Sequence, residues 1–163
     1  MAKIETIINV QGKPMRIFNL HNKVGVKGVN EMDDVMVIKA LLRYIHWDPN
    51  VCKMTGLRSS EIPSPYDGTI YGLPAIIKKF QKGVKTIKFL SDYKIIADGG
   101  VSPAKQSAVN GGIYYTIAAL NSMAIRLAYT NGGTETHIEA ILRTYQHLQQ
   151  IEEEKGSFVM GGF

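Results

Sequence analysis

The sequence predicts a mainly α-helical protein with an N-terminal β-hairpin and an added C-terminal amphipathic helix. Residues 4–20 contain two short β-branched and aromatic arms around a turn, and apolar residues recur at helical spacing in four later stretches. The composition, 45% hydrophobic and 20% charged, is that of a folded chain. With 163 residues, the chain can bury a core without disulfides or a metal ion.

The first element is the hairpin, which we assign to a unit spanning residues 1–23. Its arms are residues 4–10 and 15–20, and residues 11–14, Gln-Gly-Lys-Pro, supply the turn. Ile7 and Ile8 are adjacent, so strict alternation does not fix the register of the pairing.

A glycine-containing loop at 24–30 leads into the first helix. Asn30 or Asp33 is the expected N-cap, because either side chain can accept hydrogen bonds from the free N–H groups of the first turn. The helix is expected to end near His46, before Asp48 and Pro49. Its apolar face consists of Val35, Ile38, Leu41, Leu42 and Ile45. Residues 48–66 contain three prolines and are expected to form a long loop.

The second helix is short and is expected to begin at Pro74. Its apolar positions are Ile76, Ile77 and Phe80, and Gly83 is expected to end it in a left-handed conformation. The periodicity of residues 84–97 does not decide between a strand, an insertion and a second hairpin.

A third helix is expected over residues 113–129 and a last helix over residues 135–154. Thr136 and Glu139 have the spacing of a capping box at the start of the last helix. Its apolar stripe is Ile138, Ile141, Leu142, Tyr145, Leu148 and Ile151. Residues 156–163 are small and aromatic, and two outcomes stay open for them: docking on another surface or remaining free.

Two stretches share one pattern. Residues 67–72, Asp-Gly-Thr-Ile-Tyr-Gly, precede an apolar helix that ends in Phe80 and Gln81. Residues 98–103, Asp-Gly-Gly-Val-Ser-Pro, precede residues 116–121 after a gap. The aspartate can bond to its own backbone, glycine can adopt positive φ, and the next apolar residue can enter the core.

This ordered series resembles the peptidoglycan-binding domain family of bacterial cell-wall proteins, over about residues 24–128. The resemblance implies a three-helix peptidoglycan-binding-like core, assigned to residues 24–130, with residues 131–163 as an added helix and tail. It also implies recognition of peptidoglycan or a muropeptide. The chain departs from the family pattern in a longer loop at 48–66, an expanded segment at 82–97 and an insertion at 104–115.

The candidate ligand-binding residues are aromatic and basic. The tyrosines could stack on sugar rings, and the lysines could meet carboxylates of the wall peptide. They are Tyr66, Tyr71, Tyr114, Tyr115, Lys78, Lys79 and Lys82. Two alternatives stay open: Tyr71 and one of the pair at 114–115 fill the core, and the lysines form a solvated face without a partner. Structural turn roles are assigned to Asp67, Gly68, Gly72, Asp98, Gly99 and Pro103.

The sequence contains no constellation that predicts an enzyme, a metal site or a cofactor. His46 and Cys52 lie six residues apart, and the four histidines are not grouped at ligand spacing with acids. Six lysines between residues 78 and 94 face one acid, Asp92, which favours anionic partners. Nucleic acid is disfavoured because no recognised nucleic-acid-binding motif accompanies this basic strip.

We therefore expect a non-catalytic module that binds peptidoglycan and anchors itself or a partner at the cell wall. The alternative is a structural or adaptor protein of a phage-tail-like or secretion apparatus, with a protein partner on the C-terminal helix or tail. No membrane span and no signal peptide are expected from the apolar runs and the charged first residues. The expected route is synthesis in the cytoplasm and non-Sec export to the periplasm or cell surface.

Overall fold

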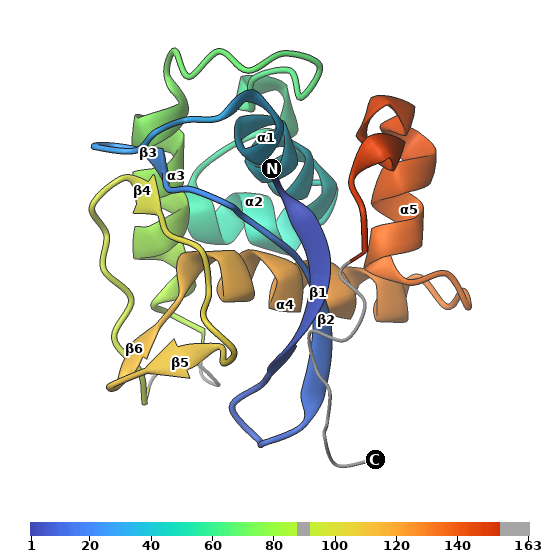
Figure 1. The fold of residues 1–163 in the computed structure, drawn as a ribbon. Helices are drawn as coiled ribbons and strands as arrows, with labels where there is room; N and C mark the ends of the chain where they lie inside the picture. Colours follow the sequence, from blue (N-terminus) through green and yellow to red (C-terminus); the bar gives the residue numbers. More distant parts are fainter. Residues whose placement is uncertain (88–91, 154–163) are drawn as a thin grey trace.

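The computed structural model describes residues 1–87 and 92–153 (Figure 1). This part of the chain is rich in helix and also contains small antiparallel strand pairs. Its α-helices are α1 (Met32–Ile45), α2 (Pro49–Thr55), α3 (Leu73–Val84), α4 (Thr116–Thr130) and α5 (His137–Thr144). The strand pairs are β1 (Lys3–Ile8) with β2 (Pro14–Asn19), β3 (Val24–Gly25) with β4 (Gly100–Val101), and β5 (Val109–Asn110) with β6 (Ile113–Tyr114).

The N-terminal hairpin is confirmed. β1 and β2 pair with Ile4 opposite Phe18 and Ile7 opposite Met15. The Asn9 side chain closes the turn, because its Oδ1 accepts hydrogen bonds from the N–H groups of Gln11 and Lys13 at 2.9 Å each. Ile7 is the buried member of the adjacent isoleucine pair, so burial fixes the register that alternation left open.

The first helix is confirmed, but both of its expected caps are wrong. α1 begins after Glu31, which makes no side-chain capping bond. Asn30 instead folds back on the loop before the helix, where its Oδ1 accepts a hydrogen bond from the Gly25 N–H at 2.6 Å. The Asp33 carboxylate accepts one from the Ala2 N–H at 2.8 Å. A loop contact for Asn30 and a long-range contact for Asp33 therefore replace the expected capping bonds.

The expected long loop at 48–66 contains a helix that sequence analysis missed. α2 begins at Pro49, the residue taken as a loop signal, because proline fits the first helical turn. The Asp48 side chain accepts a hydrogen bond from the Asn50 N–H at 2.9 Å, and Gly56 ends the helix at φ +74°. A 3₁₀ turn, Ser59–Glu61, follows.

The second helix is confirmed, but the role expected for Gly83 is wrong. α3 continues through Gly83 to Val84. A Cβ atom at Gly83 would lie 2.7 Å from the Met54 carbonyl oxygen of α2. The close approach of α2 and α3 therefore requires glycine at position 83, and a left-handed helix end does not. Of the undecided segment 84–97, residues 88–91 lie outside the described residues. Residues 92–97 form no hairpin among themselves; Lys94 instead forms a β-bridge with Ile113.

The two C-terminal helices are shorter than expected. α4 starts at Thr116, because Ile113 and Tyr114 belong to β6. α5 has the expected capping box but ends at Thr144, and the chain turns at Tyr145 into a 3₁₀ helix, Gln146–Gln150. Leu148 of the 3₁₀ helix and Ile151 after it are both buried in the core. The tail at 156–163 lies outside the described residues.

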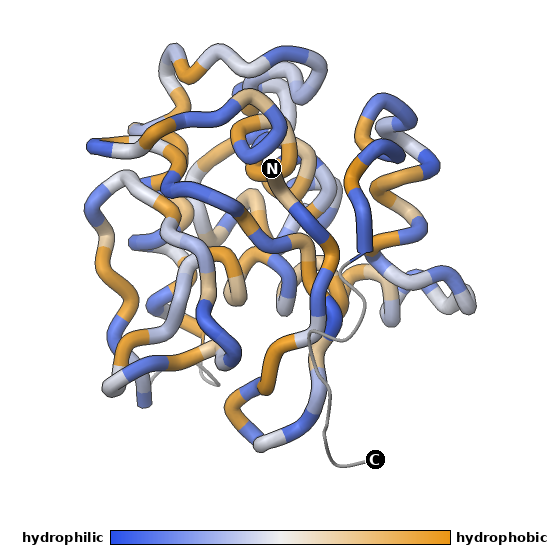
Figure 2. Tube along the Cα trace, viewed as in Figure 1, coloured by the Kyte–Doolittle hydropathy of each residue, from blue (hydrophilic) through white to orange (hydrophobic). Residues whose placement is uncertain are grey.

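One set of buried residues joins all of these elements. It includes Ile17 of the hairpin, Leu41 of α1, Phe80 of α3, Ile117 of α4 and Ile141 of α5. Figure 2 shows apolar and polar residues interleaved along α5, as expected for a helix with one buried face. The stretches 67–81 and 98–121 therefore contribute to the same hydrophobic centre.

Candidate functional site

The first Asp-Gly corner is fixed by a buried lysine. The Lys39 side chain of α1 is 0% exposed, and its ammonium lies 3.0 Å from Asp67 Oδ1 and 3.1 Å from the Asp67 carbonyl oxygen. Hydrogen bonds from the hydroxyl and N–H of Thr69, and then from Lys39, hold the pKa of the Asp67 carboxyl well below its usual range. Gly68 does not adopt positive φ. Its position leaves no space for a side chain, because an added Cβ atom would lie 2.7 Å from Met32 Cγ. The corner is thus a rigid platform before α3.

The second corner is fixed by the amide of Gln81. Its Oε1 accepts a hydrogen bond from the Gly99 N–H at 2.9 Å, and its Nε2 donates to the Gly100 carbonyl at 2.8 Å. Nε2 also lies 3.1 Å from the Thr116 hydroxyl at the start of α4. Gly99 has φ +78°, and the Asp98 carboxylate accepts from the Gly100 N–H. Gln81 therefore joins α3, the second corner and α4.

Another buried amide, that of Asn121, joins the hairpin to α4 and α5. Asn121 Nδ2 donates to the Phe18 and Ile117 carbonyls, and its Oδ1 accepts from the Phe18 N–H. His137 Nε2 donates to the same oxygen at 2.9 Å. Burial lowers the pKa of His137 to about 3. His137 is buried, and the sequence pattern did not indicate this because it does not show that Asn121 lies opposite it.

Tyr71 and Tyr66 are the exposed members of the tyrosine set. Tyr71 is 93% exposed, directly before the N-terminus of α3. Tyr66 is 60% exposed and lies with its ring 4.5 Å from the ring of His147. His147 Nε2 donates to the Pro65 carbonyl at 2.7 Å, which holds this aromatic pair in place. Both tyrosines have ring surface available to a ligand.

Tyr114 is placed differently. It is 3% exposed, its hydroxyl lies 3.1 Å from the Ser122 hydroxyl, and its ring meets that of Tyr93. Burial raises the pKa of Tyr114. Tyr115 is partly buried and packs against the core. The alternative that Tyr71 and one of Tyr114 or Tyr115 fill the core is therefore correct for Tyr114 and wrong for Tyr71.

Lys78, Lys79 and Lys82 are all exposed on α3, on the face opposite Ile77 and Phe80. Lys85 is exposed further along the same face. No ion pair involving these four lysines occurs within residues 1–87 and 92–153. We call Tyr71, Lys78, Lys79 and Lys82 the α3 face. Pro103, the last turn residue of the second corner, lies partly buried two residues after β4.

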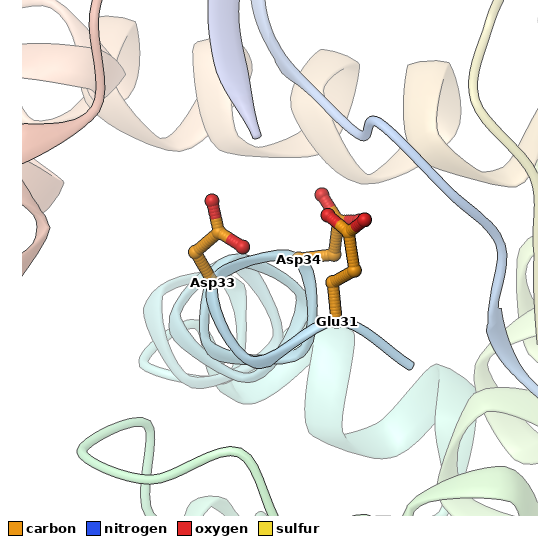
Figure 3. A group of neighbouring side chains, drawn as sticks. All are labelled: Glu31, Asp33 and Asp34. Carbon is orange, nitrogen blue, oxygen red and sulfur yellow. The ribbon is translucent and has the colours of Figure 1, made fainter. Parts of the chain in front are cut away.

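Three carboxylates meet within 4.8 Å of one another at the start of α1: Glu31, Asp33 and Asp34 (Figure 3). Oxygen ligands of this kind can hold a hard cation. Asp34 accepts hydrogen bonds from the His21 and Asn22 N–H groups at 2.9 Å each, and burial raises the pKa of its carboxyl. The amino group of Met1 lowers the pKa of Glu31 to about 2. The three acids thus tie the N-terminal residues and the 21–22 loop to α1.

His46 and Cys52 are neighbours without forming a nucleophile–base pair. The Cys52 thiol donates to the His46 carbonyl oxygen at 3.1 Å, not to its ring. His46 Nδ1 donates to the Leu42 carbonyl, and Nε2 lies 2.9 Å from the Thr55 hydroxyl. Burial lowers the pKa of His46. The imidazole therefore serves to connect α1 with α2.

A groove of about 830 Å³ opens between the hairpin tip, the C-terminal half of α4 and residues 133–138. Its apolar walls include Met15, Ile125 and Ile138, and Tyr129, which is 85% exposed, lies at its edge. Sequence analysis missed this groove. The adjacent apolar residues of α4 were the available signal, but their meeting with the hairpin depends on long-range packing.

The fold and these features define a helix-rich protein with small strand pairs, two tied Asp-Gly corners and an exposed basic helix face. No protein-family model, no curated protein and no solved structure matches the chain. None of the described helices combines the length and apolar character that crossing a bilayer requires.

Proposed function

We propose that the protein is a non-catalytic binding module for peptidoglycan, which it contacts through the α3 face. The observation that carries the proposal is that α3 presents three exposed lysines, Lys78, Lys79 and Lys82, and that the exposed Tyr71 comes just before this helix. Peptidoglycan offers sugar rings for an aromatic side chain and peptide carboxylates for ammonium groups. The ordered motifs that resemble peptidoglycan-binding domains support the same ligand.

The first corner supports this role by orienting the face. Asp67 and Thr69 accept hydrogen bonds from the Lys39 ammonium, and these bonds fix the position of the turn that precedes α3. Lys78 and Lys82 are about one helical turn apart, so their Cα atoms are separated by about 6 Å along the helix axis and both side chains leave the same face. A repeating anionic polymer can engage several such groups at once, although each exposed pair is weak alone.

The test is sedimentation of the full chain with purified sacculi. Tyr71→Ser combined with Lys78→Gln and Lys82→Gln should weaken binding by about tenfold or more. The matched control is Tyr129→Ser combined with Lys13→Gln and Lys53→Gln, which removes another largely exposed tyrosine and two exposed lysines outside the α3 face. Absence of sedimentation by the wild-type chain, or equal losses in both variants, would contradict the proposal.

A second candidate is a structural or adaptor role within a phage-tail-like or secretion apparatus. The apolar groove beside the hairpin supports it, because a wall-binding module does not need a second, mainly apolar surface. Capture of one defined partner protein by a chain that ignores sacculi would favour this role over the first.

A further inference from the structure

The groove beside the hairpin has the size and the apolar walls of a small-molecule site. Its volume of about 830 Å³ lies within the range of about 300–1,000 Å³ that such sites occupy. Met15, Ile125 and Ile138 line it. A site of this kind also needs a few polar atoms that orient the ligand. His137, another residue of the lining, supplies one of them.

Hydrogen bonds fix which ring nitrogen of His137 carries the proton. Asn121 Nδ2 donates to the carbonyl oxygens of Phe18 and Ile117, so the amide oxygen of Asn121 is the atom that faces His137. This oxygen can only accept, and His137 Nε2 lies 2.9 Å from it. Nε2 therefore carries the proton, and Nδ1 has a lone pair that can accept a hydrogen bond but cannot donate one.

The lone pair of His137 Nδ1 has no hydrogen-bond partner within the described residues, although the residue is only 3% exposed. Among the described side chains, only His147 has a nitrogen or oxygen that is both sealed from solvent and without a partner. Nδ1 of His137 therefore retains accessible surface, and it opens to the groove that this residue lines. Burial, and then the charge of Arg16, lower the pKa of His137 to about 3, so the lone pair is present at neutral pH.

Three charged residues also belong to the lining. Arg16 is paired with Glu153 at 2.7 Å, and Glu135 is paired with Arg143 at 2.9 Å. The third, Arg126, is exposed on α4 and also has an interaction partner. A neutral ligand leaves these interactions in place, whereas a charged ligand would compete for one member of a pair.

We propose that the groove binds small, uncharged molecules with an apolar body and a hydroxyl group, which donates its hydrogen bond to Nδ1 of His137. A hydroxyl supplies the donor without a carbonyl group that would need a partner of its own. An ether of the same shape would leave Nδ1 desolvated and unpartnered, which costs affinity. This site is separate from the proposed wall contact, because the groove and the α3 face share no residue.

NMR titration of the full chain with para-cresol and with cyclohexanol tests the proposal. Each is compared with its methyl ether, which keeps the apolar body but cannot donate. Both alcohols should shift the methyl signals of Ile125 and Ile138 and bind about fivefold more tightly than their ethers. They should also shift the nitrogen resonance of His137 Nδ1. Absence of binding by both alcohols, or equal binding of alcohol and ether, would overturn the proposal.

A variant tests whether Nδ1 is the acceptor. His137→Phe keeps an aromatic ring without a lone pair, and the Asn121 oxygen still accepts from the Phe18 N–H. Alcohol and ether should then bind equally, whereas His21→Phe, which removes an exposed histidine outside the groove, should keep the preference. A preference retained by His137→Phe would contradict the proposal. Should this variant not fold, an unchanged Nδ1 resonance in the wild type saturated with para-cresol would overturn it equally.

Discussion

At the scale of single residues, buried amides and one buried lysine connect the parts of this protein. Gln81 and Asn121 each bond to backbone groups of elements distant in the sequence. Lys39 does the same for the first corner. A buried polar group is costly when it lacks a partner, so each of these side chains specifies one arrangement of its neighbours.

Asn121→Ala should lower the free energy of unfolding by about 3 kcal/mol, because the N–H and C=O of Phe18 would be left buried without partners. Urea denaturation of the variant measures this loss. Thr130→Ala, at the exposed end of α4, is the control and should change stability by less than about 0.5 kcal/mol. A loss at Asn121 no larger than that at Thr130 would be inconsistent with the role of this amide.

The two corner aspartates should differ in importance. Asp67→Ala removes the carboxylate that faces the fully buried Lys39 ammonium, whereas Asp98→Ala removes a bond to Gly100 and a looser pair with Lys23 at 3.8 Å. Thermal unfolding should therefore show a larger decrease in Tm for Asp67→Ala. Equal decreases would indicate that Lys39 finds sufficient partners in the Asp67 carbonyl and Thr69.

At the scale of elements, close contacts between helices decide positions that local propensity would fill differently. Gly83 lies inside α3, where alanine would be favoured by about 1 kcal/mol on propensity alone. The nearby backbone of α2 excludes a side chain at this position. α5 likewise ends at Thr144, although the apolar stripe of the sequence continues to Ile151; Leu148 and Ile151 pack in the core from the 3₁₀ helix and the residue after it.

Gly83→Ala should therefore destabilise the protein by about 1–3 kcal/mol, since the new methyl group would overlap the Met54 carbonyl. Chemical denaturation gives the value. Gly133→Ala is the matched control: the nearest atom to its added Cβ is 3.8 Å away, so the change should be near zero. Stabilisation by Gly83→Ala would mean that α2 and α3 can separate without cost.

At the scale of the whole molecule, the hairpin, the central helices and α5 share one core, and His137 lies where they meet. Its pKa is about 3 in the folded protein, against about 6.5 in an unfolded chain. Within this window the unfolded chain binds more protons than the folded one. Stability is therefore lost as the pH falls from about 6.5 toward 3, on the order of 4 kcal/mol from this residue.

His137→Gln should remove this pH dependence, because glutamine keeps an N–H for Asn121 but does not titrate. The difference in unfolding free energy between wild type and variant should narrow or change sign between pH 7 and pH 4. Urea denaturation at both pH values measures it. A constant difference would show that His137 can be protonated in the folded protein.

The sequence alone determined the hairpin, the existence of α1, α3 and α4, the capping box of α5 and the two Asp-Gly corners. These features depend on residues close in the chain, where local geometry and periodicity act. Only the tertiary structure decided four other features: the need for glycine at position 83, the burial of Tyr114 and His137, the end of α5, and the groove. Each depends on atoms brought together from distant parts of the chain, and their contacts outweigh the local preferences that a sequence pattern expresses.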